Sequence, residues 1–179
     1  YTRLRLGDAE DTPLSLLTRA AELNPESAEV EASLGRYYSI TDDTEAATAH
    51  FNRAIELLDA GGEMRPAEIG SVCTALGKLL QEQRPAAAEP FFRRALTIGI
   101  QLEDEQRVRE NRPAGIYTAR WYWEAAYRLA GILRDTNRQA QAATYYKWTL
   151  PYVPGQPEEL NSRRALAVIQ QVVPAGQIV

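Results

Sequence analysis

Apolar and alanine residues recur at spacings of three and four along nearly the whole chain of 179 residues. Amphipathic helices require this spacing, because 3.6 residues complete one helical turn and such positions then share a face. Alternation with a period of two, which a half-buried strand requires, is almost absent. The sequence therefore predicts an all-α protein.

The chain also contains a longer repeat. One pattern of small and large residues occurs three times. The first copy consists of Leu34, Gly35, Tyr38, Ala47, Phe51 and Ala54. A second copy has Leu129, Ala130, Leu133, Ala142, Tyr146 and Pro154 at matching offsets, with Thr149 in place of the last alanine. A copy between them, Leu76, Gly77, Leu80, Ala88, Phe92 and Ala95, fits if its turn is one residue shorter. The small residues let two helices approach closely, and the large ones fill the adjoining space.

This spacing resembles that of the tetratricopeptide repeat (TPR) family. The separation of 42 positions between Leu34 and Leu76, with the segment "AAAEPFFRRALTI", is similar to the kinesin-light-chain type of this repeat. The resemblance implies a right-handed alpha-alpha solenoid of about three and a half TPR-like helix hairpins, followed by a C-terminal capping helix. Three repeats are about the minimum for a stable stack.

The hairpins predict the organisation of one TPR-like domain over residues 1–179. Its parts are a partial repeat (1–25), repeats at 28–59, 67–100 and 117–154, an insert (101–116) and a capping helix (156–173). Thr12 with Pro13 and the residues 41–44 predict helix starts, whereas Asn24 with Pro25 predicts a helix end. The capping helix carries its apolar stripe at Ala165, Leu166, Ile169, Val172 and Val173. Leu4, Leu6 and Leu14 form an apolar edge that we expect preceding chain or a partner to cover.

Composition argues against several classes of function. A formal net charge of −4 and a pI of 5.2 give no basic field of the kind that nucleic-acid binding needs. No apolar run approaches the length of a membrane span, and no targeting segment is evident, so the compartment stays open between cytoplasm and periplasm. Cys73 and His50 are the only residues of their kinds and have no catalytic or metal-binding pattern around them. We expect no enzyme, no metal and no cofactor.

The segment "YTARWYWEAAY", residues 117–127, is unusually aromatic. On a helix over 117–134, the side chains of Tyr122 and Trp123 fall near the buried face and are expected to pack against the preceding helix. Tyr127 falls on the flank. Tyr117 and Trp121 point to the opposite side, where contact with the inserted helix and contact with a partner both remain open.

The family resemblance implies a protein-protein interaction scaffold that binds a peptide or helical segment in a concave groove lined by the first helix of each hairpin. The groove positions would be Glu29, Ala32, Arg36, Ser39, Ile40, Ser71, Thr74, Lys78, Gln81, Glu124, Tyr127, Gly131, Arg134 and Asp135. The family's carboxylate clamp is disfavoured, because Ala32 and Arg36 stand at the positions of its Lys and Asn.

The candidate partner-binding residues are Arg36, Ile40, Lys78, Tyr127, Arg134 and Glu124, together with Trp121 and Tyr117. Arginine and tyrosine are common in binding hot spots, and the cations favour an acidic or C-terminal ligand. Alternatively, the charges of this face pair only with one another. A second class of function also stays open: a structural or accessory subunit that is permanently packed within a larger complex or a longer chain.

Overall fold

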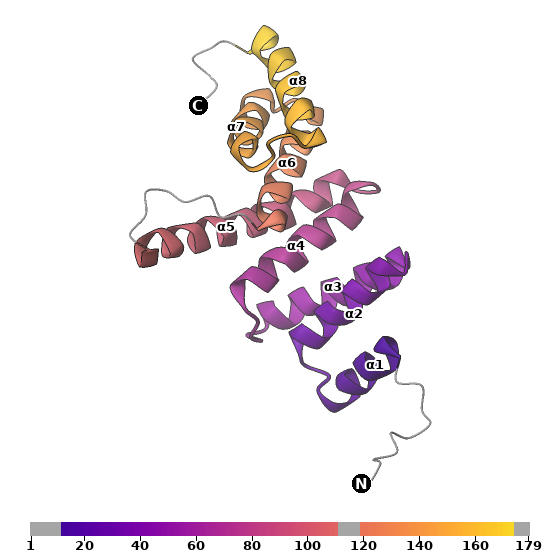
Figure 1. The fold of residues 1–179 in the computed structure, drawn as a ribbon. Coiled ribbons are helices and arrows are strands. Elements are labelled where there is room, and N and C mark those ends of the chain that lie inside the picture. Colours follow the sequence, from indigo (N-terminus) through magenta and orange to yellow (C-terminus); the bar gives the residue numbers. More distant parts are fainter. Residues whose placement is uncertain (1–11, 111–118, 174–179) are drawn as a thin grey trace, which may run out of the picture. The chain divides into compact units, whose positions relative to one another are not determined.

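The computed structural model describes residues 12–110 and 119–173, which are helical with short connections and contain no strand (Figure 1). The predicted all-α class is therefore confirmed for these residues. The chain divides into two compact units, Tyr1–Met64 and Arg65–Val179. Among the described residues, no helix is both long enough and apolar enough to cross a membrane.

The first unit contains three described helices, α1 (Pro13–Leu23), α2 (Ala28–Ile40) and α3 (Thr44–Asp59). Helix α2 packs against both of the others. Helix α1 has no buried residue, and Leu14 is half-buried. Leu4 and Leu6 lie outside the described residues, so the expected apolar edge is only partly visible.

The second unit begins with the hairpin of α4 (Pro66–Gln81) and α5 (Pro85–Glu110). A second hairpin follows, formed by α6 (Arg120–Asp135) and α7 (Gln139–Thr149). The short 3₁₀ helix η1 (Leu150–Tyr152) leads to α8 (Pro157–Val172), which packs on α7. Helix α6 also contacts α4 and α5 and so joins the two hairpins.

Local sequence signals account for the helix ends. The side chains of Thr12, Ser27 and Asp43 accept hydrogen bonds from backbone N–H groups in the first turns of α1, α2 and α3. Helix α1 ends before Asn24, as its Asn-Pro pair predicts. Helix α6 begins at Arg120 rather than at residue 117, because the backbone of Ala119 is extended and acts as the N-cap.

Glycines allow the helices of each hairpin to approach closely. A Cβ atom at Gly35 would lie 2.6 Å from the ring of Phe51, and one at Gly77 would lie 2.7 Å from the ring of Phe92. Both phenylalanines are fully buried. The two contacts join α2 to α3 and α4 to α5, so the small residues of the sequence pattern do mark close helix contacts.

The predicted insert extends an existing helix. Helix α5 runs without interruption from Pro85 to Glu110, so residues 101–110 lengthen the second helix of its hairpin. Pro90 lies in the second turn of α5 without ending it, in keeping with its expected place near the helix start. The expected loop at residues 111–115 lies outside the described residues.

Helix α8 buries most of its predicted apolar stripe. Ala165, Leu166 and Ile169 are buried, whereas Val172 is 67% exposed. The inclusion of Val172 was therefore wrong, because the buried face of α8 instead includes Ser162. The Ser162 hydroxyl lies 3.5 Å from that of Thr149 on α7, which gives both buried hydroxyls a partner.

Candidate functional site

The aromatic segment of α6 is largely part of the packing, as predicted for Tyr122 and Trp123, both of which are buried. The ring of Tyr122 lies over Gly99 of α5, where a Cβ atom would collide with it. Its hydroxyl donates a hydrogen bond of 2.9 Å to a carboxylate oxygen of Glu103. Burial, with the Glu103 carboxylate beside it, raises the pKa of Tyr122 well above its usual value. This tyrosine therefore anchors the extended part of α5 to α6.

Trp121 contacts helix α4. Its ring lies over Gly70, and its backbone carbonyl accepts a hydrogen bond of 3.0 Å from the hydroxyl of Thr74. The sequence predicted that Trp121 contacts either the inserted helix or a partner. Its contact with α4 is neither of these. The prediction of a groove-facing Thr74 was also wrong, because its side chain is buried between α4 and α6. Tyr117 lies outside the described residues.

The charged residues on α4 and α6 pair with one another. Lys78 lies 2.9 Å from a carboxylate oxygen of Glu124, and Arg128 on the next turn of α6 lies 3.2 Å from the same oxygen. Burial opposes ionisation of Glu124, but Lys78 and Arg128 together outweigh it and lower the pKa of this carboxyl. Lys78 and Glu124 are therefore engaged with each other, as the alternative interpretation of this face expects.

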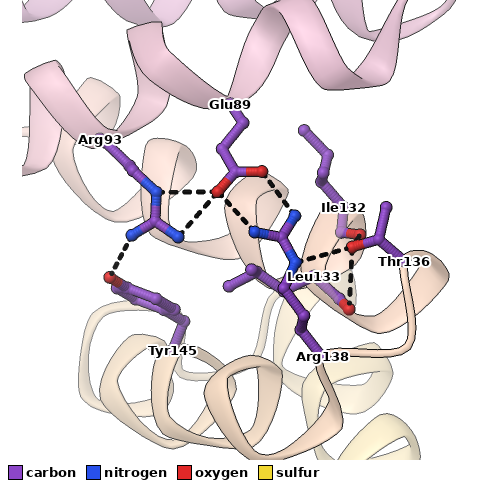
Figure 2. A network of polar contacts seen from close by, with 7 residues as sticks. All are labelled: Glu89, Arg93, Ile132, Leu133, Thr136, Arg138 and Tyr145. Carbon is purple, nitrogen blue, oxygen red and sulfur yellow. Dashed lines mark hydrogen bonds and ion pairs between the residues drawn. The ribbon is translucent and has the colours of Figure 1, made fainter.

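A second charge network joins α5 to the start of α7 (Figure 2). Glu89 accepts hydrogen bonds of 2.8 and 2.5 Å from the guanidinium of Arg138 and one of 2.9 Å from Arg93. The Arg138 hydrogen bonds hold the pKa of Glu89 at about 2, against the opposing effect of burial and with further help from Arg93. This network fixes the turn before α7 to α5.

Two predicted site residues lie in the first unit. Arg36 is half-buried on α2, and Ile40 at the end of the same helix is 82% exposed. Ala32, also expected to face the groove, is fully buried, so that prediction was wrong. Other predicted groove residues, such as Lys78 and Tyr127, belong to the second unit. A single partner-binding surface formed by residues of both units therefore stays a prediction.

The structure brings Tyr127 and Arg134 together at a cleft of about 480 Å³ in the second unit. The residues that line it are Tyr127, Arg134, Tyr146, Asn161, Arg164, Ala165 and Val168. They come from α6, α7 and α8. The contribution of α8 was not predicted from the sequence, although Asn161, Arg164 and Val168 are spaced at three and four residues and thus lie on one helix face.

The side chains of His50 and Cys73 lie within the packing of their units. The His50 ring stacks on Tyr38 with ring centroids 5.2 Å apart, and its Nδ1 lies 2.7 Å from a carboxylate oxygen of Glu31. Cys73 is buried, as expected for a small apolar side chain. Within residues 12–110 and 119–173, no three His, Cys, Asp or Glu side chains form a group that could hold a metal ion.

Comparison with known proteins does not add a family or a relative. No protein-family model matches the chain, and no curated protein is detectably similar to it in sequence. The resemblance to tetratricopeptide repeats therefore stays a prediction from residue spacing.

Proposed function

We propose that this protein is a helical-repeat scaffold that binds a segment of another protein in a groove lined by the first helices of its hairpins. One observation carries the proposal: the same positions are buried in successive hairpins. Leu34 and Phe51 in the first unit have exposed fractions of 4% and 0%, and their counterparts Leu129 and Tyr146 have 0% and 3%. Equivalent packing is what a repeat architecture requires.

The turns of two hairpins support the same conclusion. Asp42 and Asn137 both have a φ of 61°, and each stands five residues before the first residue of the repeat pattern in the second helix, Ala47 or Ala142. In both turns the following backbone N–H donates to a carbonyl five residues earlier, Asp43 to Tyr38 and Arg138 to Leu133. Asp and Asn adopt this left-handed conformation more readily than most residues do.

The middle hairpin supports the repeat with one difference. Leu76, Ala88, Phe92 and Ala95 are all fully buried, like the matching residues of the first hairpin. Its turn is shorter and has no residue with positive φ. These three hairpins and α8 favour a specific all-α architecture, a right-handed solenoid with a terminal capping helix. Such repeats create extended concave surfaces that suit extended ligands.

A shared fold does not establish a shared function, and the function of a protein depends on its site. The Lys78–Glu124 pair is self-neutralised, whereas the cleft formed by Tyr127 and its neighbours on α7 and α8 is open. Val168 at this cleft is 63% exposed, which gives a ligand an apolar contact. These features favour the cleft as the binding part of the groove.

A structural-subunit role is the second candidate, and exposed apolar side chains favour it. Leu23 on α1 and Val108 on α5 are 79% and 78% exposed. In that role, permanent neighbours would cover such residues. The protein would then be isolated only with its companion.

Site-specific photo-crosslinking separates the two functions. A benzoylphenylalanine at Val168 would report on the cleft, and one at Glu105, an exposed residue of α5, would be the control. In extracts of the source organism, we expect crosslinks to a partner from Val168 and not from Glu105. Crosslinks from Glu105 alone, on a protein that purifies only as a stable complex, would support the subunit role and reject the scaffold.

A further inference from the structure

The cleft between α6, α7 and α8 presents positive charge and hydrogen-bond donors. Its described lining residues include two arginines, two tyrosines and one asparagine, and no carboxylate. Its volume of about 480 Å³ lies within the range of ligand sites, about 300–1,000 Å³. This composition selects for an anionic ligand.

The two arginines retain unused donors. Arg164 is exposed and forms no salt bridge with any described residue. Arg134 forms an ion pair only with its neighbour Asp135, through Nε at 2.8 Å, and its two terminal nitrogens have no partner within the described chain. By contrast, Lys78 and Arg138 each contact a carboxylate that is 12% or 16% exposed. Both guanidinium groups of this cleft can therefore donate to a ligand.

Tyr146 supplies a further donor at the cleft. Its side chain is almost fully buried, at 3% exposure, and its hydroxyl forms no hydrogen bond with the described residues. The hydroxyl lies opposite Gly131 of α6, where an added Cβ atom would be 3.9 Å from it. Burial is the main influence that raises the pKa of this phenol, so it stays protonated and can donate. No buried side-chain nitrogen or oxygen of the described residues lacks a hydrogen-bond partner, so the unpaired Tyr146 hydroxyl retains exposed surface through which it can donate to a ligand oxygen.

An apolar surface adjoins these donors. The ring of Tyr127 meets that of Tyr146 edge to face, with centroids 6.0 Å apart. Val168 on α8 remains 63% exposed. A ligand that places an apolar group beside a carboxylate would therefore use both parts of the cleft.

We infer that the cleft binds an acidic segment of a partner protein, with an Asp or Glu side chain between Arg134 and Arg164 and an adjacent apolar side chain against Tyr127 and Val168. This inference rests on the proposed scaffold function and gives the chemistry of its ligand. Two guanidinium groups can form charge-assisted, forked hydrogen bonds to a carboxylate, and the Tyr146 hydroxyl can donate to it as well.

Calorimetry with the full chain and a blocked peptide, acetyl-Gly-Leu-Glu-Glu-Leu-Gly-amide, tests the inference. We expect this peptide to bind about tenfold more tightly than its Gln-Gln counterpart. Arg164→Gln should weaken binding of the acidic peptide about tenfold. Arg163→Gln is the matched control, because it removes the same charge from the adjacent position of α8, where Arg163 pairs with Glu159 at 2.8 Å.

Three results would overturn the inference. Equal affinity for the Glu and Gln peptides would exclude recognition of side-chain carboxylates. Equal losses in Arg163→Gln and Arg164→Gln would indicate only a general charge effect. Binding restricted to a Gln peptide with a free C-terminus, or to inorganic phosphate, would assign the cleft to another anion. If Val168 still crosslinks a partner in any of these cases, the scaffold function stands and only the ligand chemistry fails, whereas absence of that crosslink rejects the scaffold itself.

Discussion

Two glycines in the helices of the second unit have opposite surroundings. At Gly77, a Cβ atom would lie 2.7 Å from Phe92, a residue with no exposed surface that cannot move aside without repacking. At Gly131, the nearest atom to a Cβ would be the Tyr146 hydroxyl at 3.9 Å, which is ordinary contact. The same substitution should therefore have opposite effects on stability at these two positions.

We predict that Gly77→Ala lowers the free energy of unfolding by about 1–3 kcal/mol, because it overpacks the contact between α4 and α5. Gly131→Ala should instead raise the free energy of unfolding by about 0.5–1 kcal/mol, because alanine favours the helix more than glycine does. Urea denaturation of both variants measures the difference. If the two substitutions shift the midpoint in the same direction, the described helix contact is wrong.

At the scale of helices, the ion pairs of Glu89 link α5 to α7 and make stability depend on pH. The folded pKa of Glu89, about 2, lies below the unfolded value of about 4.3. A carboxyl with a lowered folded pKa stabilises the fold fully above the unfolded pKa and loses this effect as pH falls toward the folded pKa. The relevant interval is therefore about pH 4.5 down to about pH 2.

We predict that Glu89→Gln is less stable than the unmodified chain by about 1–2 kcal/mol at pH 7, a value reduced for the solvent exposure of the two arginines. The difference should shrink steadily between pH 4.5 and pH 2. Urea denaturation across this range checks it, with Glu105→Gln, at an exposed site on the same helix, as the control. A difference that stays constant with pH would show that the ion pairs do not determine the effect of the substitution.

Helix positions were predictable because the signals that determine them are local. Thr12 and Asp43 cap their helices through backbone groups three residues away, and Phe51 reaches Gly35 through a single hairpin. The packing of one hairpin on the next was less predictable. Trp121 over Gly70 depends on how α6 crosses α4, and sequence spacing within either helix does not specify that crossing.

The candidate site shows the same limit. The sequence placed Tyr127 and Arg134 on one face of a single helix, and both line the same cleft. The pairing of Lys78 with Glu124 and the arrival of Arg164 at the cleft each require contacts between helices that are distant in sequence. Identifying such contacts needs the tertiary packing, which periodicity does not contain.

For the whole molecule, the division at Met64 and Arg65 has a measurable consequence. The fragment 65–179 retains both hairpins of the second unit, helix α8 and the network around Glu89. Since each of these contacts is internal to the fragment, we predict that it folds alone, with helical far-ultraviolet dichroism and a cooperative thermal transition. A fragment that is disordered at 25 °C would show that residues 1–64 are needed to complete its core.

The contacts between glycines and aromatic rings also bear on how this sequence can evolve. Gly35, Gly70, Gly77 and Gly99 each face an aromatic ring that occupies the volume of their missing side chain. A larger residue at any of these positions is compatible with the fold only if the facing ring becomes smaller at the same time. Homologous chains should therefore show correlated exchange of volume at the pairs 35/51, 70/121, 77/92 and 99/122, and changes at only one member of a pair should be rare.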